Sequence, residues 1–382
     1  MASTAPHSSP SDQAFIDEAL VLAAEALTRS NPNPRVGCVI VRSDGQVLGR
    51  GSTQQAGGPH AEIMALRDAA AAGHEVRGAT AYVTLEPCAH HGRTGPCCDA
   101  LIAAGIGRVV ASLEDPNPLV AGQGLARLRA AGVAVDLGPG AEAARELNLG
   151  FFSRMVRKTP WVRMKIAASL DGTTALSNGA SQWITSPAAR ADGHAWRARA
   201  CAILTGSGTV LADNPRLDVR EHPTPRQPHV AVVDSRLRTP PDASLLIANT
   251  ARIFYATGPF DAQSAEAQRQ QVLEAKGAQV AHLPNTSGQV DLAAMLRDLA
   301  ARGVNELHVE AGHRLNGALI AAGLVDEFLV YLAPKLLGPG RGMADWGPLT
   351  ALTQGLDLEF RSIERVGPDL RILARVQGRD AF

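Results

Sequence analysis

One histidine and two cysteines, His60, Cys88 and Cys97, stand where a loop or a strand gives way to a helix in the pattern of the sequence. One imidazole and two thiolates are three ligands of a tetrahedral zinc site, and a fourth position left to water distinguishes a catalytic zinc ion from a structural one. Bound zinc brings the pKa of its water down to roughly 7, which makes hydroxide available at neutral pH. The pattern therefore predicts a domain that holds one catalytic zinc ion.

A carboxylate accompanies these ligands. Glu62 lies two residues after His60, close enough to contact a zinc-bound water without ligating the metal. A carboxylate in that place can take the proton of the water and return it to a leaving amine, so Glu62 is the expected catalytic acid and base. His-x-Glu followed by Pro-Cys and a second Cys is the signature of the zinc nucleobase deaminases.

The spacing of the cysteines departs from that signature. Eight residues separate Cys88 from Cys97, whereas the signature has two. The inserted loop carries His90 and Arg93, which suit a substrate with an anionic arm such as a ribose phosphate. The rival interpretation is a structural zinc site with four protein ligands, which would recruit Cys98 or His90 and would leave the nearby glutamate without a role.

Several segments of the first half closely resemble the bifunctional deaminase/reductase family of bacterial riboflavin biosynthesis. The segments that carry the resemblance are residues 33–37, 60–62, 84–94 and 115–118. The family has a cytidine-deaminase-like α/β/α fold in this half. The resemblance also implies that Asn33 helps to hold the pyrimidine of the substrate.

Strand-length apolar runs alternate with helical patterns in both halves, which predicts two α/β domains with partly parallel sheets. Helical spacing predicts one helix from Gln13 and one continuous helix over residues 141–155. A charged, proline-terminated linker predicts a boundary between Phe152 and Pro160. The expected parts are a disordered tail over 1–12, a zinc-dependent pyrimidine deaminase domain over 13–156, and an NADPH-dependent reductase domain over 159–382.

The second half resembles the reductase half of the same family, whose fold is similar to dihydrofolate reductase. The matching segments are residues 165–172, 181–185, 212–215, 309–312 and 333–338. The residues that the resemblance implies for NADPH are Ala167, Trp183, Thr209, Asp213, Ser235, Gly312, His313, Arg314, Leu315, Asn316, Gly317 and Ala318. Those implied for the substrate are Ser181, Arg197, Leu217, Arg220 and Glu310, with the arginines on its phosphate. Lys165 and Asp171 match catalytic positions close to the reacting sugar.

The resemblance implies two reactions in riboflavin biosynthesis. They are zinc-hydroxide deamination of 2,5-diamino-6-ribosylamino-4(3H)-pyrimidinone 5′-phosphate, and NADPH reduction of the ribosyl group to a ribityl side chain. One alternative is a zinc deaminase of another nucleobase whose second half is a non-catalytic binding or oligomerisation domain. Another is a non-catalytic protein that zinc stabilises for interaction with partners.

Composition limits the partners. The formal net charge is zero and aromatic residues make up 4% of the chain, so we expect a small-molecule substrate and no nucleic acid. The sequence contains no run of 18 apolar residues, so we expect no membrane span, and its polar N-terminal segment does not have the pattern of a signal peptide. Five unevenly spaced cysteines favour a reducing, cytoplasmic location. Enzymes of this kind are commonly symmetric, so we expect a homodimer or higher homo-oligomer.

Overall fold

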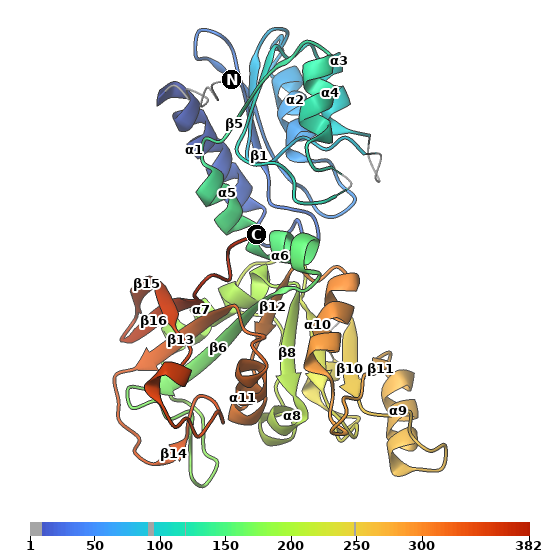
Figure 1. Cartoon of the computed structure of the whole chain (residues 1–382), viewed down its shortest axis with the longest axis vertical. Coiled ribbons are helices and arrows are strands. Elements are labelled where there is room, and N and C mark those ends of the chain that lie inside the picture. Colours follow the sequence, from blue (N-terminus) through green and yellow to red (C-terminus); the bar gives the residue numbers. More distant parts are fainter. Residues whose placement is uncertain (1–9, 91–94, 119, 248–249) are drawn as a thin grey trace. The chain divides into compact units, whose positions relative to one another are not determined.

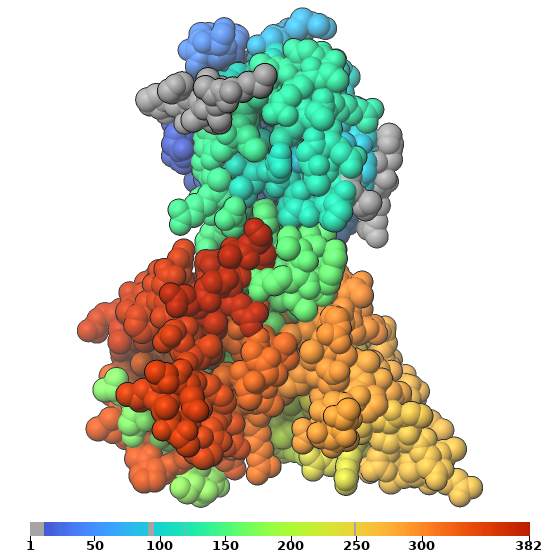
Figure 2. Space-filling view, in the orientation of Figure 1, coloured from blue at the N-terminus to red at the C-terminus, as the bar shows by residue number. Residues whose placement is uncertain are grey.

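The computed structural model describes residues 10–90, 95–118, 120–247 and 250–382. The chain divides into two compact units, one ending at Arg157 and the other running from Lys158 to Phe382. Each unit is one continuous stretch of chain, as the colours of the space-filling view show (Figure 2). Both units combine helices with a mixed sheet, so the predicted α/β class is confirmed.

The first unit is built on a five-stranded sheet in the order β2-β1-β3-β4-β5. Strand β1 runs antiparallel to both of its neighbours, whereas β3, β4 and β5 are parallel. Because β3 and β4 are parallel neighbours, the segments that follow them start at the same edge of the sheet. The strands are β1 (Gly37–Val41), β2 (Val47–Ser52), β3 (Thr80–Val83), β4 (Arg108–Ala111) and β5 (Ala134–Leu137).

Helices cover both faces of this sheet, with α1 and α5 on one side and α2, α3 and α4 on the other (Figure 1). Glycine lets two of them approach closely: a Cβ atom at Gly37 would lie 1.9 Å from the carbonyl oxygen of Ala19, and one at Gly51 would lie 2.3 Å from that of Ala61. The helices are α1 (Pro10–Glu25), α2 (Ala61–Ala71), α3 (Cys97–Ala103), α4 (Gln123–Ala130), α5 (Ala141–Leu147) and α6 (Leu149–Arg157).

Two expectations about helices in this unit are wrong. Helix α1 begins at Pro10 rather than Gln13, so the last part of the expected disordered tail is helical. The reason is Asp12, whose buried carboxylate accepts hydrogen bonds from the Tyr82 hydroxyl at 2.8 Å and from Arg108 Nη1 at 2.9 Å. The expected single helix over 141–155 is two helices, α5 and α6, separated at Asn148. Residues 1–9 lie outside the described part of the chain.

The second unit contains a nine-stranded sheet in the order β11-β10-β9-β8-β12-β6-β13-β16-β15. The strands from β11 to β13 are parallel, and β16 and β15 complete the sheet as an antiparallel hairpin. The main strands are β6 (Trp161–Ser169), β8 (Ala202–Gly206), β9 (His229–Val233), β10 (Arg252–Ala256), β11 (Gln279–His282), β12 (Glu306–Val309), β13 (Glu327–Ala333), β15 (Leu358–Val366) and β16 (Asp369–Val376). A separate two-stranded sheet pairs β7 (Ala175–Leu176) with β14 (Gly340–Arg341).

The parallel strands form the core of this unit. Their side chains belong to two large apolar clusters, one centred on β6, β8 and β12 and the other on β9 and β10. The turns that follow β8, β9 and β12 all leave at the carboxyl edge of the sheet, where ligands bind in open α/β folds. The helices are α7 (Pro187–Arg199), α8 (Ser207–Asp213), α9 (Ala265–Ala275), α10 (Leu292–Ala301) and α11 (His313–Ala321), with 3₁₀ turns over Ser244–Leu246 and Leu352–Gln354.

Candidate active sites

The three predicted metal ligands of the first unit converge. His60 is the N-terminal cap of α2, Cys88 follows β3, and Cys97 is the first residue of α3. His60 Nδ1 lies 3.6 Å from Cys88 Sγ and 3.4 Å from Cys97 Sγ, and the three donor atoms all lie within 4.8 Å of one another. Tetrahedral zinc with its usual bond lengths places an imidazole nitrogen and a thiolate sulfur about 3.6 Å apart. The donor set therefore fits zinc.

Among the described residues, the additional ligands that a structural zinc site would need are not at the cluster. Cys98 Sγ lies 3.7 Å from Asp99 Oδ1 and is not one of the donor atoms that converge. His90 lines the pocket beside the cluster but is likewise not among its donors. Over the described residues, three protein atoms thus leave a fourth tetrahedral position to solvent or substrate. The thiol of Cys88 is prepared for ligation, because a hydrogen bond with Cys97 and another with His60 lower its pKa.

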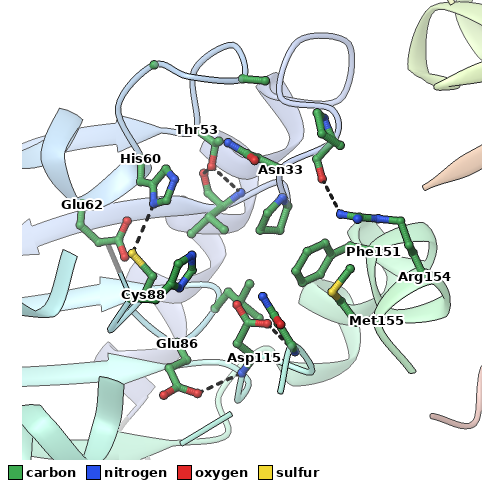
Figure 3. Close-up of a pocket in the computed structure, with 18 of the residues that line it drawn as sticks. Asn33, Thr53, His60, Glu62, Glu86, Cys88, Asp115, Phe151, Arg154 and Met155 are labelled. Atoms are coloured by element: carbon green, nitrogen blue, oxygen red, sulfur yellow. Dashed lines mark hydrogen bonds between the residues drawn. The ribbon is translucent and has the colours of Figure 1, made fainter. Parts of the chain in front are cut away.

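Glu62 stands in the first turn of α2, beside the ligands, and only 3% of it is exposed. Burial, and next the negative charge of Cys88, raise the pKa of Glu62 to about 7, although the nearby His60 opposes this. A carboxyl group with that pKa exchanges protons readily at neutral pH. Figure 3 shows Glu62, His60 and Cys88 together on one side of the pocket.

This pocket has a cavity volume of about 550 Å³, and every residue that lines it belongs to the first unit. Of the residues expected at the deaminase site, Asn33, His60, Glu62, Cys88 and His90 line it. Arg93 lies outside the described residues. The wall opposite Glu62 comes from α6, which supplies side chains that the sequence pattern did not identify (Figure 3). They are Phe151, Arg154 and Met155.

Another residue whose role the sequence pattern did not reveal is Glu86, which immediately precedes the Pro-Cys pair and is 3% exposed. Its Oε2 accepts hydrogen bonds from the backbone N–H groups of Asp115 at 3.1 Å and Gly122 at 2.9 Å. Its Oε1 accepts from those of Gly124 at 2.8 Å and Leu125 at 3.2 Å. One carboxylate thus joins the edge of β3 to the loop that follows β4, and that loop forms part of the pocket.

Asp115 opens this loop and is the third buried carboxyl group that lines the pocket. Its Oδ1 accepts a hydrogen bond of 2.8 Å from the backbone N–H of Asn117. Burial raises the pKa of Asp115 to about 7, and the charge of Glu86 adds to the increase. The position was detectable in principle, since polar residues after two adjacent parallel strands share one sheet edge.

In the second unit, the structure brings together four of the residues expected to bind substrate. Arg197 on α7 donates from Nε and Nη2 to Glu310, at 2.5 and 2.8 Å, and from Nη1 to the carbonyl oxygen of Asp218 at 3.0 Å. Arg220 Nη1 lies 2.8 Å from Asp218 Oδ1, and Leu217 is buried next to it. Ser181, in the segment between β7 and α7, makes no hydrogen bond to these residues within the described chain.

Glu310 and Lys165 have opposite charges and lie in the same buried region. Burial by itself would raise the pKa of Glu310, but the charge and hydrogen bonds of Arg197 lower it well below its usual value. The pKa of Lys165, on β6, is lowered by burial and by the charge of Arg197, against the opposing effect of Glu310. Its ammonium nitrogen lies 5.9 Å from the centre of the Tyr331 ring. The site therefore holds an acidic and a basic group side by side.

The glycine-rich turns after β8 and β12 pack against each other. A Cβ atom at Gly312 would lie 3.6 Å from Thr209 Oγ1, and one at Gly206 would lie 3.3 Å from Leu315 Cδ2. Helix starts of this kind offer backbone N–H groups to phosphates, so the arrangement fits a dinucleotide. Asp213, at the end of α8, belongs to the same region.

The other residues expected at the cofactor are distributed around this edge. Ala167 lies in β6, Ser235 follows β9, and His313, Arg314 and Ala318 belong to α11. Trp183 is 62% exposed, with the guanidinium of Arg190 4.4 Å from the ring centre. Two positions of α11 face the 343–345 segment instead: Asn316 Nδ2 donates to the Met343 carbonyl at 2.9 Å, and a Cβ atom at Gly317 would lie 1.9 Å from the Asp345 carbonyl oxygen.

Asp171, expected to be catalytic, lies in the turn after β6. Its carboxylate accepts hydrogen bonds from the backbone N–H groups of Gly338 at 2.7 Å and Leu337 at 3.2 Å, and from the Ser169 hydroxyl. These contacts connect the ends of β6 and β13. They indicate that Asp171 positions the loop, and its catalytic role stays a prediction.

The fold and the two sites define a zinc-binding deaminase domain joined to a reductase domain. Residues 9–113 match the family model described as the cytidine and deoxycytidylate deaminase zinc-binding region, and residues 160–372 match that of the RibD C-terminal domain. The riboflavin biosynthesis protein RibD of Escherichia coli (strain K12) is 46% identical over 372 residues, which cover 94% of this chain and 98% of that protein. The chain belongs to the RibD family of riboflavin biosynthesis proteins.

Solved structures agree with this assignment. A RibD structure from Acinetobacter baumannii superposes with a TM-score of 0.86 at 37% identity, covering 96% of this chain and 99% of that one. A deaminase/reductase from Thermotoga maritima gives a TM-score of 0.83 at 30% identity, with the same coverage. The protein is therefore a bifunctional enzyme of riboflavin biosynthesis, with zinc and NADPH as the cofactors of its two domains. No helix in the described ranges is long and apolar enough to span a membrane.

Proposed function

We propose that the two domains act in succession on one pyrimidine ribosyl phosphate. The first converts 2,5-diamino-6-ribosylamino-4(3H)-pyrimidinone 5′-phosphate to the corresponding uracil, and the second reduces the ribosyl group to a ribityl chain with NADPH. The Thermotoga maritima relative is described as a diaminohydroxyphosphoribosylaminopyrimidine deaminase/5-amino-6-(5-phosphoribosylamino)uracil reductase, which supports this choice of substrate. The observation that carries the proposal is the convergence of His60, Cys88 and Cys97 beside buried Glu62.

In the deaminase reaction, His60, Cys88 and Cys97 would hold the zinc ion. Zinc supplies acidification of water at neutral pH. Glu62 takes one proton of the water as its oxygen bonds to the amino-bearing carbon, and passes it to the ring nitrogen. It then takes the proton of the new hydroxyl group and passes it to the amine, so that the carbon–nitrogen bond breaks, ammonia leaves and a carbonyl group remains. A pKa of about 7 suits both transfers. Asn33 on the pocket wall orients the pyrimidine.

In the reductase reaction, the turns at Thr209 and Gly312 would hold the NADPH phosphates, and NADPH supplies the hydride that C1′ of the sugar accepts. Opening of the ribose ring also needs a proton on the ring oxygen. Lys165, whose pKa is lowered, is the side chain we propose to deliver it. Arg197 and Arg220 hold the substrate phosphate, while Glu310 fixes Arg197 in place.

The test measures two products from the full-length zinc-loaded chain. With the diamino substrate, ammonia release should precede NADPH consumption, and with the deaminated substrate NADPH should be consumed without ammonia. Removal of zinc by a chelator should stop ammonia release and leave NADPH consumption on the deaminated substrate. Absence of ammonia release from the diamino substrate by the zinc-loaded chain would reject the proposal.

A homo-oligomer and a cytoplasmic location complete the proposal. Strand β15 is one of the two edge strands of the nine-stranded sheet, and it exposes Leu358 at 43%, Phe360 at 65% and Ile363 at 56%. Exposed apolar residues on an edge strand favour pairing with another chain, and a second copy is the partner we propose. Light scattering of the purified protein decides between a monomer and an oligomer. None of the five cysteines is in a disulfide bond, which supports a reducing compartment.

A further inference from the structure

Helix α6 lies outside both matched family regions, since one ends at residue 113 and the other begins at 160. It is nevertheless part of the deaminase pocket. Phe151, Arg154 and Met155 line the cavity on the side opposite Glu62 and Cys88 (Figure 3). Their spacing of three and four residues places them on one face of the helix. The helix that ends the first unit thus provides a complete wall of the site.

The structure fixes this wall relative to the segment that carries Asn33. Where α5 ends and α6 begins, Asn148 Oδ1 accepts the backbone N–H of Arg35 at 2.8 Å, and Asn148 Nδ2 donates to the Arg35 carbonyl at 2.9 Å. Arg35 Nη1 donates to the Leu147 carbonyl at 2.7 Å. Both Asn148 and Arg35 are buried, so these bonds are shielded from water. A helix held in this way keeps its side chains in place before substrate arrives.

Among the described residues, acidic and basic side chains lie on different sides of the pocket. Glu62, Glu86 and Asp115 contribute carboxyl groups near the metal ligands. Among the described residues that line the cavity, Arg154 is the one with a cationic side chain of the Arg or Lys type. Arg154 Nη2 donates to the Pro32 carbonyl at 3.3 Å, and its guanidinium carbon lies 5.9 Å from the centre of the Phe151 ring. The Arg154 guanidinium would attract an anionic group of the substrate to this wall.

We propose that α6 is the substrate-recognition wall of the deaminase, with Arg154 binding the sugar phosphate arm. Phe151 and Met155 cover the apolar face of the pyrimidine, and the guanidinium makes charge-assisted hydrogen bonds to the phosphate oxygens. The amino-bearing carbon then points toward Glu62, because the phosphate is held at the opposite wall. This inference rests on the proposed function and adds the residues that select a phosphorylated substrate.

The test compares Arg154→Met with the parent enzyme by ammonia release from the phosphorylated substrate and from its dephosphorylated analogue. We expect KM for the phosphorylated substrate to rise about 10- to 100-fold, the size of a lost charge-assisted hydrogen bond, with little change in kcat. KM for the analogue should stay the same. Arg129→Met is the matched control, because Arg129 is an exposed arginine on α4 outside the pocket.

Calorimetric titration with ribose 5-phosphate provides a readout that does not depend on turnover. We expect two sites per chain in the parent enzyme, one in each domain, and one site in Arg154→Met. Arg154→Lys keeps the positive charge and is used in place of Arg154→Met if the Met variant does not fold. KM of the Lys variant for the phosphorylated substrate should rise less than the increase expected for the Met variant. Equal increases in KM for both substrates, or two sites retained in the Met variant, would overturn the inference. Failure of the parent enzyme to release ammonia would instead count against the proposed function.

Discussion

Buried carboxyl groups behave in opposite ways in the two domains. In the deaminase pocket, burial raises the pKa of Glu62 and of Asp115 to about 7. In the reductase site Glu310 is 14% exposed, yet its pKa lies well below the usual value because the charge and two hydrogen bonds of Arg197 lower it. The same side-chain type is therefore close to its titration point in one domain and permanently charged in the other.

The two reactions explain this difference. Deamination moves protons between water, carboxylate and amine, so its acid–base group must change protonation near neutral pH. Reduction moves a hydride that the cofactor carries, and the proton for ring opening is proposed to come from Lys165, so Arg197 and Glu310 have only to hold a charged substrate in place. Fixed ion pairs such as Arg197–Glu310 do this without gaining or losing protons. The difference between the two reactions thus corresponds to a difference between two acids: Glu310 has an arginine partner, whereas Glu62 has none among the described residues.

The largest effect should come from Glu62→Gln, which keeps the size of the side chain and removes its ability to transfer protons. We expect ammonia release to fall by about 10²- to 10⁴-fold, the usual contribution of general acid–base catalysis. NADPH consumption on the deaminated substrate should remain near normal, since Glu62 belongs to the first unit. Parallel assays of both products check this. Equal loss of both activities would contradict two separate sites.

Arg197→Met tests the other side of the comparison. It leaves Glu310, which is 14% exposed, without its bidentate partner, and losing hydrogen bonds to a charged group typically costs about 1.5–3 kcal/mol of unfolding free energy. NADPH consumption should fall while ammonia release persists. Chemical denaturation measures the stability change, and the double variant Arg197→Met/Glu310→Gln is the control, because it removes the unpaired charge. We expect the double variant to recover stability but not the reduction of substrate. Unchanged stability in the single variant would show that Arg197 does not stabilise the charge of Glu310.

The sequence was sufficient to predict that His60, Cys88 and Cys97 come together, because a metal site depends on side chains at characteristic spacings. It also predicted the α/β class, since apolar runs and helical patterns alternate clearly in both halves. Glu86 was beyond such reasoning. Its four partners are backbone N–H groups located 29 to 39 residues further along the chain, and no side-chain pattern records a backbone donor.

The α6 wall was missed for a related reason. The apolar pattern over residues 141–155 is continuous, so it predicts one helix with a buried face. The break arises at Asn148, which bonds to Arg35, a residue 113 positions earlier. That long-range contact turns Phe151 and Arg154 toward the pocket, and only the folded structure brings the two segments together. Local propensity therefore located the helix but not its function.

Glu86→Gln separates a carboxylate that organises the deaminase site from those that act in it. Both Glu86 oxygens accept two backbone hydrogen bonds each, so an amide NH₂ at either end would face N–H donors. We expect the first unit to lose about 1–3 kcal/mol of stability and ammonia release to decrease through a higher KM. Glu114→Gln is the matched control, because Glu114 is exposed in the same loop. A loss in kcat alone would instead assign Glu86 to the chemical step.

The smallest effect concerns the pH dependence of stability. Because the pKa of Asp115 is raised in the folded state, its charged form is disfavoured there, and the first unit loses stability as pH rises from about 4 to about 7. Asp115→Asn keeps the acceptor for the Asn117 N–H and removes the charge, so it should raise the unfolding free energy at pH 8 by about 1–3 kcal/mol and change it little at pH 4. Thermal unfolding at both pH values measures this. Asp44→Asn is the control, since hydrogen bonding to Arg42 lowers the pKa of Asp44 and the exposed pair should give no gain in stability at pH 8.

Glu310 predicts the opposite pH dependence for the second unit, whose stability should decline as pH falls below about 4.5 toward the lowered pKa of this group. If both units gained or lost stability together with pH, the contrast between an unpaired and a paired buried acid would not be what distinguishes the two sites.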